Sequence, residues 1–196
     1  NFWSKLEDKH LIELVNKIIS DSGDNPKRDG IAGTPERVAK LYSELLSGYS
    51  MKIEDVIKNS LFSTTLDDMI VVKNIEFNSL CEHDLTPFFG TVNVGYIPER
   101  KIIGLSKIPK IIEIFSKRLQ VQENLTNEIS SALDSIISPH GLGVVIEAKH
   151  LCSILRGDNF SSSNLTTSSM HGSFRSNLNT RQEFLSHIQN NIKWKI

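Results

Sequence analysis

The chain has 196 residues, 39% of them hydrophobic and 23% charged, with a formal net charge of −1, which is the composition of an ordinary globular domain with a real core. A net charge so close to zero argues against broad, non-specific nucleic-acid binding, so an anionic ligand must be held by a local cluster of cations. No apolar run approaches the roughly 18 residues of a membrane span and no signal-peptide pattern opens the chain, so we expect neither a membrane nor a nucleic acid among its partners.

Two helices are predicted in the N-terminal part. Leucine, isoleucine and valine recur at helical spacing over residues 5–20, which indicates an amphipathic helix. After a loop rich in glycine and asparagine, Thr34 followed by Pro35 predicts a second helix that is capped by Thr34 and ends near Gly48. We expect residues 1–65 to form a helical region that precedes the main domain.

The middle of the chain combines strands with helices. From Met69 to Pro98, β-branched and aromatic residues alternate in part, which predicts two antiparallel strands joined by a connection that contains Cys81-Glu82-His83-Asp84. Ser106 is expected to cap an isoleucine-rich helix, and a second helix is expected from about Gln122 to Ile137.

The last third returns to strands and ends in a helix. Alternation over residues 141–154 predicts a strand that ends in His150-Leu151-Cys152, and we interpret residues 161–169 as a β segment with exposed hydroxyls. Residues 180–183 form a capping-box pattern for a last helix. This order of elements is typical of an α+β protein, whose main domain we place at residues 66–196.

The two cysteines, Cys81 and Cys152, leave three interpretations open. They can form one disulfide, lie buried and unrelated, or share a functional site. Two cysteines in a chain without a leader pattern fit a reducing cytosol better than an oxidising compartment. We therefore expect a cytoplasmic protein whose thiols are available for metal binding or catalysis.

Each cysteine has metal-ligating or proton-transferring residues beside it. Cys81 precedes His83 and Asp84, and His150 stands two residues before Cys152, on the same face if this segment is a strand. If the two segments adjoin, two thiolates and one carboxylate can hold a divalent metal with one position open for water, as in catalytic zinc sites, while the histidines transfer protons. By itself the pattern is weak, because such small clusters occur by chance and a single histidine is more often structural.

A second set of residues can bind an anionic nucleotide. Ser106 and Lys107 at a helix start can hold phosphate through backbone N–H groups, a hydroxyl and an ammonium group. Gln122 precedes Glu123, whose carboxylate can accept two hydrogen bonds from guanine. Each residue also has an ordinary explanation, because cations on helices mostly face solvent and Glu is common at helix starts. The cations of this set are Arg37, Lys40, Lys107, Lys110 and Arg156.

Several longer strings go beyond these small clusters. They are Thr34-Pro35-Glu36-Arg37-Val38-Ala39-Lys40, Ser79-Leu80-Cys81-Glu82-His83, Pro87-Phe88-Phe89-Gly90, Tyr96-Ile97-Pro98, Ile103-Gly104-Leu105-Ser106-Lys107, residues 118–126, residues 145–152 and Asn179-Thr180-Arg181-Gln182-Glu183-Phe184-Leu185. Together these strings resemble the GTP cyclohydrolase I family. The strings occur in order from about residue 10 to 188, and several are long and specific. The resemblance therefore covers nearly the whole chain.

The resemblance implies a fold and a reaction. The fold is the T-fold (tunnelling fold), with N-terminal helices, an antiparallel sheet and two packed helices, in subunits that form a ring-shaped homo-oligomer, typically a decamer with sites between subunits. The reaction is hydrolytic opening of the GTP imidazole ring at C8, with release of formate and rearrangement to 7,8-dihydroneopterin triphosphate. This product feeds folate, tetrahydrobiopterin or deazapurine pathways.

The resemblance also implies a role for each matching residue. Cys81 and Cys152 match the two thiolate ligands of the metal, and His83 and His150 match the proton-transfer histidines. The other matches are Gln122 and Glu123 for guanine recognition, Ser106 and Lys107 for triphosphate and ribose, with Ser106 counted as catalytic, and Arg37, Lys40 and Arg156 for the remaining phosphate contacts.

Two positions depart from the family pattern. Lys110 stands where the family has Arg, which keeps the charge but loses bidentate phosphate geometry. Asp84 stands where the family has the His that is its third metal ligand. A carboxylate can ligate Zn²⁺, but three anionic ligands weaken the Lewis acidity of the metal, and the harder oxygen favours Fe²⁺ or Mn²⁺ as alternatives.

Asp84 leaves more than one function open. The chain can be a working enzyme with a Cys81/Asp84/Cys152 metal site, an impaired variant, or a non-catalytic relative that binds GTP or a pterin. Another T-fold enzyme, such as a pyruvoyl-tetrahydropterin synthase or a nitrile reductase, is disfavoured by the contexts of the two cysteines and by Ser106-Lys107. We predict the working enzyme, because the flanking histidines and the phosphate-binding residues are all present.

Overall fold

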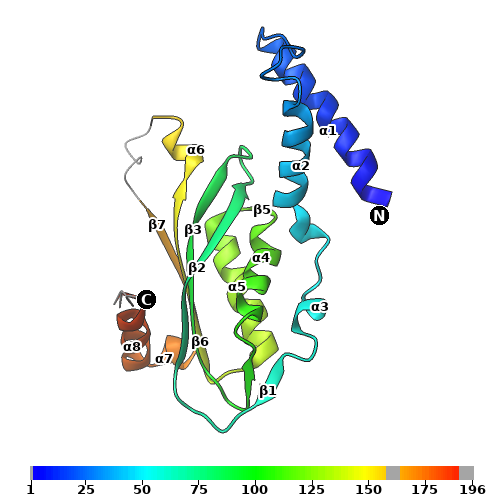
Figure 1. Cartoon of the computed structure of the whole chain (residues 1–196). Coiled ribbons are helices and arrows are strands. Elements are labelled where there is room, and N and C mark those ends of the chain that lie inside the picture. Colours follow the sequence, from blue (N-terminus) through cyan, green and yellow to red (C-terminus); the bar gives the residue numbers. More distant parts are fainter. Residues whose placement is uncertain (1, 158–163, 190–196) are drawn as a thin grey trace, which may run out of the picture. The chain divides into compact units, whose positions relative to one another are not determined.

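The computed structural model describes residues 2–157 and 164–189, which fall into two compact units, one reaching to Ser47 and one starting at Gly48. The first unit contains α1 (Phe2–Asp21) and α2 (Thr34–Leu45), which contact each other (Figure 1). Gly33, not Thr34, occupies the cap position of α2, and the Thr34 hydroxyl instead accepts a hydrogen bond from Arg37 at 2.7 Å. The cap expected at Thr34 was therefore wrong.

η1 (Ser47–Tyr49) spans the boundary between the units, and α3 (Ile53–Ile57) and β1 (Leu61–Ser63) follow it. Apolar side chains of α3 and β1 pack against the core of the second unit. The structure therefore divides the chain nearer to its N-terminal end than the boundary expected after residue 65.

The second unit is built on a five-stranded sheet with the order β5-β2-β3-β6-β7. Its long strands are antiparallel neighbours: β2 (Ile70–Cys81), β3 (Pro87–Ile97), β6 (Gly141–His150) and β7 (Leu165–Gly172). The short β5 (Leu119–Gln120) runs parallel to the last residues of β2, and a separate small sheet pairs β1 with β4 (Lys101–Ile103). The α+β class and the predicted hairpin are confirmed.

Helices cover the two faces of this sheet unequally (Figure 1). On one face α4 (Lys107–Ser116) and α5 (Gln122–Ile137) enclose the main core, in which Phe88, Leu125 and Ile129 are fully buried. On the other face α7 (Ser173–Ser176) and α8 (Leu178–Gln189) enclose a smaller core around Phe174 and Phe184.

Two predicted boundaries in the last third of the chain were wrong. The strand expected to end in His150-Leu151-Cys152 ends at His150, and α6 (Leu151–Ile154) follows. His150 pairs with Phe88, and the neighbouring β3 begins only one residue earlier, so no strand partner continues beyond this point. The last helix starts before Thr180, because Asn177 Oδ1 accepts the N–H groups of residues 179 and 180. The β segment expected over residues 161–169 begins at Leu165 as β7, and residues 161–163 lie outside the described part.

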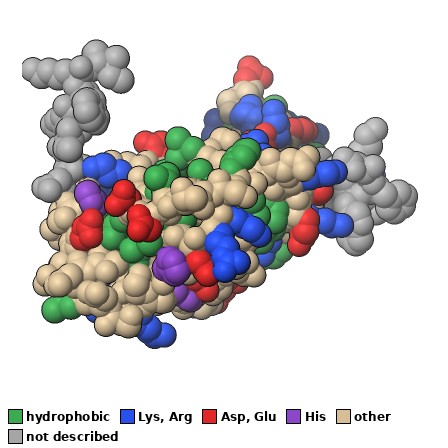
Figure 2. All heavy atoms as spheres, turned by 90° about the horizontal axis from the view of Figure 1, so that it is seen from below, with side chains coloured by type: hydrophobic (Ala, Val, Ile, Leu, Met, Phe, Trp, Pro, Cys, Tyr) green, Lys and Arg blue, Asp and Glu red, His purple; other side chains and the backbone are tan. Residues whose placement is uncertain are grey.

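One face of the molecule shows a mixture of side-chain types. On the face seen in Figure 2, acidic and basic side chains are interspersed among apolar and uncharged ones, in keeping with the formal net charge of −1. No helix within the described ranges combines the length and the apolar character that a membrane crossing requires.

Candidate active site

The turn between β2 and β3 carries three of the predicted site residues, Cys81, His83 and Asp84. The Cys81 N–H donates to the Thr86 carbonyl at 2.8 Å, and the Leu85 N–H donates to the Cys81 carbonyl at 2.9 Å. Leu85 takes a left-handed backbone conformation with φ of 58°, which closes the turn. These backbone bonds fix the turn, so its side chains start from defined positions.

A pocket of ≈ 270 Å³ lies beside this turn and is called the thiol pocket; its lining residues are Cys81, His83, Asp84, Cys152, Ser153 and Arg156. Both cysteines are free, and Cys81 Sγ lies 3.6 Å from His83 Nδ1. Burial, the neighbouring Cys81 thiol and the Asp84 carboxylate together raise the pKa of Cys152. The two cysteines therefore share one site, although Cys152 reaches it from α6 and not from a strand.

Asp84 is turned toward the protein. Its Oδ1 accepts hydrogen bonds from the Thr86 hydroxyl at 2.7 Å and from the Thr86 N–H at 3.2 Å. Its Oδ2 pairs with the Arg156 guanidinium at 3.1 Å. The hydrogen bond from the Thr86 hydroxyl, aided by the Thr86 N–H and by Arg156, holds the pKa of Asp84 below its usual value. The carboxylate is therefore ionised at neutral pH, and both of its oxygens are engaged.

His150 lies at the end of β6, two residues before Cys152. Its ring is stacked on Phe88, with 4.7 Å between the ring centroids and 6° between the planes, and its Nε2 lies 2.8 Å from Gln122 Oε1. Burial lowers the pKa of His150, and the Glu123 carboxylate opposes this shift. The ring is therefore neutral at pH 7 and held on two sides.

The side chain of Gln122 does not face an open site. It is fully buried, and its amide nitrogen contacts the carbonyls of Ile146 and Leu165 and the hydroxyl of Thr167 at 3.0–3.1 Å. The polar atoms of this side chain bond inside the fold in this structure, and its contact with a guanine base stays a prediction. Glu123, the next residue on α5, is exposed and keeps its carboxylate available.

Comparisons with known proteins identify the family of the chain. A family model described as GTP cyclohydrolase I matches residues 11–189. The chain belongs to the GTP cyclohydrolase I family. It is similar to proteins named GTP cyclohydrolase 1 from Campylobacter jejuni strain RM1221, Teredinibacter turnerae and Leptospira biflexa, each 46% identical over 176 to 180 residues, which are 90–92% of this chain and 95–97% of those proteins. Among solved structures, it is similar to the apo form of an archaeosine synthase QueF-like protein, with 15% identity and a TM-score of 0.45 over 53% of this chain and 93% of that one.

The family resemblance implies a bound metal ion. The thiol pocket contains the kinds of ligand that zinc uses, since two thiols and a carboxylate line it. The arrangement does not fit an ion. Within residues 2–157 and 164–189, no three His, Cys, Asp or Glu side chains are placed so that they could hold one. Asp84 instead bonds to Thr86 and Arg156. Asp84 as a third ligand stays a prediction.

Three predicted phosphate-binding residues lie at the N-terminal end of α4. Ser106 precedes the helix without a side-chain capping bond, and Lys107 and Lys110 lie in its first turns. α4 leads from β4 to β5, and β5 pairs with the end of β2 that carries Cys81. A helix of ten residues is about 15 Å long, so a single chain does not bring Ser106 into the thiol pocket.

The predicted cations of the first unit, Arg37 and Lys40, are both exposed. Arg37 donates to the Thr34 hydroxyl, and Lys40 lies 4.0 Å from Glu44 in an exposed ion pair. Their assignment to phosphate stays a prediction.

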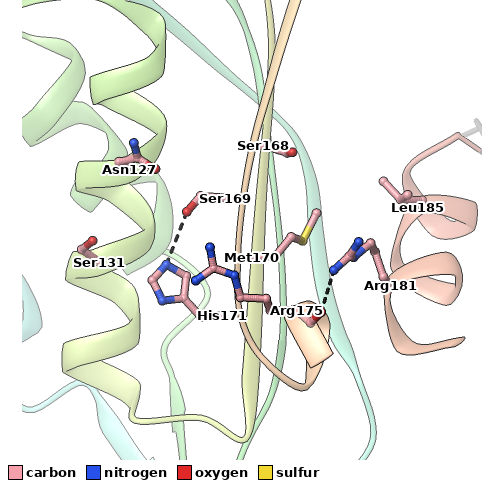
Figure 3. A pocket seen from close by; sticks show the side chains of 9 residues that line it. All are labelled: Asn127, Ser131, Ser168, Ser169, Met170, His171, Arg175, Arg181 and Leu185. Carbon is pink, nitrogen blue, oxygen red and sulfur yellow. Dashed lines mark hydrogen bonds between the residues drawn. The ribbon is translucent and has the colours of Figure 1, made fainter. Parts of the chain in front are cut away.

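A second pocket, of ≈ 520 Å³, lies between α5, β7, α7 and α8 (Figure 3). Arg181 donates there to the carbonyls of Phe174 and Arg175, and His171 Nε2 lies 3.1 Å from the hydroxyl of Ser130. The pocket is the larger of the two, but none of the predicted site residues and no thiol lines it. We therefore place the chemistry at the thiol pocket.

Sequence reasoning missed the residues that support the site. Thr86 follows Asp84 at the spacing of an Asx turn, which is a signal that could have identified it. Phe88 and Thr167 carried no such signal, because their contacts with His150 and Gln122 join segments that are far apart in the sequence.

Proposed function

We propose that this protein hydrolyses GTP at C8, opens the imidazole ring, releases formate and forms 7,8-dihydroneopterin triphosphate. One observation carries the proposal: two free thiols from separate segments meet in a pocket with His83, and the fixed ring of His150 lies two residues from one of them. Relatives of nearly the same length are named GTP cyclohydrolase 1, which supports the same reaction.

Two histidines serve the proton transfers of this proposal. His150 is neutral at pH 7, because burial lowers its pKa, so it can accept a proton from the attacking water. His83 is exposed beside Cys81, where it can give a proton to the ring nitrogen that leaves C8. Both residues therefore act on the imidazole ring of GTP and not on its phosphates.

The remaining residues of the proposal hold the nucleotide. Glu123 accepts hydrogen bonds from the N1–H and the amino group of guanine, because its carboxylate is exposed beside His150. The cations and hydroxyl proposed for the triphosphate and ribose are Ser106, Lys107, Lys110, Arg156, Arg37 and Lys40. Arg156 reaches the thiol pocket directly, so it is the best supported of this set.

The proposed site is completed by a second copy of the chain. Ser106 and Lys107 lie about one α4 length, roughly 15 Å, from the thiol pocket of their own chain. In the described residues β7 has a strand neighbour on one side only, and β2 is covered by β5 only at its Cys81 end. Two open edges on one sheet allow head-to-tail pairing that closes a ring, as in the proposed T-fold decamer. A cytoplasmic location stays a prediction.

We propose metal dependence on the strength of Cys81 and Cys152, with Zn²⁺ as the expected ion and Fe²⁺ or Mn²⁺ as alternatives. The third ligand is the open question, since Asp84 would have to leave Thr86 and Arg156 to serve. None of the binding and proton-transfer roles given above depends on whether Asp84 is the third ligand.

The test is incubation of the purified, oligomeric protein with GTP. Stoichiometric formate and a pterin triphosphate, detected by fluorescence after oxidation, are expected. Tight GTP binding without formate would instead identify a non-catalytic relative. Light scattering on the same sample measures the mass of the assembly, and a monomer that retains full activity would contradict a site shared between copies.

A further inference from the structure

The orientation of the Gln122 amide is determined by its neighbours. One end of the amide lies 3.1 Å from the Ile146 carbonyl oxygen and 3.0 Å from the Leu165 carbonyl oxygen. Backbone carbonyls only accept hydrogen bonds, so this end must be the NH₂ group. The other end, 2.8 Å from His150 Nε2, is therefore the amide oxygen.

The amide oxygen in turn determines the state of the histidine. An amide oxygen accepts and does not donate, so the His150 Nε2 that faces it must carry a hydrogen. We propose that Gln122 is a positioning residue that keeps a hydrogen on His150 Nε2 and leaves Nδ1 as the free acceptor of the ring. The catalytic part of this inference rests on the proposed function; the tautomer does not.

A buried network keeps Gln122 in this orientation. The Thr126 hydroxyl donates to the main-chain carbonyl of Gln122 at 2.7 Å and lies 2.7 Å from the Thr167 hydroxyl. The Thr167 hydroxyl also contacts the side-chain amide nitrogen of Gln122. Gln122 is 0% exposed and Thr126 is 1% exposed, so water cannot replace these bonds. A flipped amide would place its oxygen against two carbonyl oxygens, which is unfavourable where no water can intervene.

Phe88 restricts the plane of the His150 ring. The two rings are parallel within 6°, and Phe88 is fully buried, so the plane of His150 is set by the core of the sheet. Gln122 fixes which nitrogen of the ring faces the interior, while Phe88 fixes the plane. Together they present Nδ1 in one orientation, as a proton acceptor requires.

The tautomer is tested directly by solid-state ¹⁵N NMR of the assembled protein labelled at histidine. The His150 signals are assigned by their loss in His150→Asn. Neutral His150 is expected to show a protonated Nε2 and an unprotonated Nδ1, and Gln122→Met is expected to give a mixture of the two tautomers. A protonated Nδ1 in the unmodified protein would overturn the proposal, whatever reaction the protein catalyses.

Kinetics separate positioning from guanine recognition. Gln122→Met is expected to lower kcat by ~10- to 100-fold, the range seen when a supporting hydrogen bond is lost, with KM for GTP nearly unchanged. Glu123→Gln is expected to do the reverse, raising KM and weakening the preference for GTP over inosine triphosphate, which lacks the amino group. Loss of that preference in Gln122→Met would show that Gln122 reads the base and would overturn the positioning role.

Ser130→Ala is the matched control for the fold. Ser130 is also on α5, is also fully buried and also bonds a β7 hydroxyl, Ser169 at 2.8 Å, but it does not contact His150. It is expected to lower the melting temperature while leaving kcat and the His150 tautomer unchanged. An equal fall of kcat in Ser130→Ala would assign the effect of Gln122→Met to general loosening and would overturn the proposal. If the unmodified protein releases no formate, the proposed reaction fails, and the NMR result still decides the tautomer.

Discussion

The β2–β3 turn and the end of β6 each bring a histidine to the candidate site, but they hold it differently. His150 is stacked on a fully buried ring and bonded to a fully buried amide. His83 is exposed, and its contact with Cys81 Sγ is long, at 3.6 Å. One side of the site is therefore preorganised by the core, whereas the other is free to adjust to a ligand.

Asp84 belongs to the adjustable side of the site, the β2–β3 turn. Its ion pair with Arg156 joins a side chain that is 19% exposed to one that is 67% exposed, so water screens it and its rupture costs little. The hydrogen bonds around Gln122 have no such access to water. Rearrangement on ligand or metal binding is therefore expected in the turn and not at the end of β6.

The largest expected effect is at His150. His150→Asn should reduce formate release by ~10²- to 10⁴-fold, because a positioned proton acceptor contributes about that much. Steady-state kinetics with GTP measure it, and circular dichroism checks the fold. His171→Asn in the second pocket is the control and should retain activity. A larger loss of formate release in His83→Asn than in His150→Asn would show that the turn, and not the end of β6, contributes more to catalysis.

The next effect concerns the third metal ligand. If Asp84 rotates to bind the ion, Asp84→Ala should lose metal and activity together, while Asp84→His should bind metal ~10-fold more tightly, because imidazole is the better ligand for zinc. Elemental analysis of the assembled protein, with formate release on the same sample, measures both. Full metal content in Asp84→Ala would show that the carboxylate only supports the turn and Arg156.

Arg156 should affect binding more than stability. Arg156→Ala is expected to raise KM for GTP about tenfold, the effect of losing one charged hydrogen bond to phosphate, while the exposed pair with Asp84 contributes only ~0–1 kcal/mol to the free energy of unfolding. Arg175→Ala, which removes an exposed arginine from the second pocket, should leave KM unchanged. A fall in kcat at constant KM would instead indicate that Arg156 acts through Asp84.

Much of the fold could be predicted from local pattern. The hairpin around Cys81 and the helix over residues 122–137 are confirmed, because the hairpin is rich in β-branched and aromatic residues that alternate in part, and helical spacing persists through the helix. Boundaries failed where partners far away in the sequence decide them. β6, for example, stops at His150 because β3 begins beside it. The α2 cap failed for a local reason, since the Thr34 hydroxyl accepts a hydrogen bond from Arg37, three residues further on.

The candidate site divides in the same way. The sequence located Cys81, His83, Cys152 and Arg156, which the structure brings into one pocket. It could not show that Asp84 faces Arg156, or that the Gln122 amide bonds to β6, β7 and His150, because both facts depend on contacts between distant segments. Ser106 and Lys107 were grouped with these residues by resemblance, yet a single chain keeps them at the far end of α4.

The smallest expected effect tests whether the core orients His150. Phe88→Leu should lower the free energy of unfolding by ~1–2 kcal/mol, because a fully buried ring is replaced by a smaller side chain. It should also reduce kcat a few-fold at constant KM, since the ring of His150 loses the surface that sets its plane.

Phe174→Leu is the matched substitution for Phe88→Leu, because Phe174 is equally buried but lies in the smaller core on the other face of the sheet. Thermal denaturation should show a similar loss of stability for both variants, and kinetics should show a fall in kcat for Phe88→Leu alone. If both variants lose kcat equally, the activity follows global stability, and the contrast between a preorganised His150 and an adjustable turn would no longer explain the site. If kcat falls only in Phe88→Leu, the packing of the sheet core is what holds the proton acceptor in place.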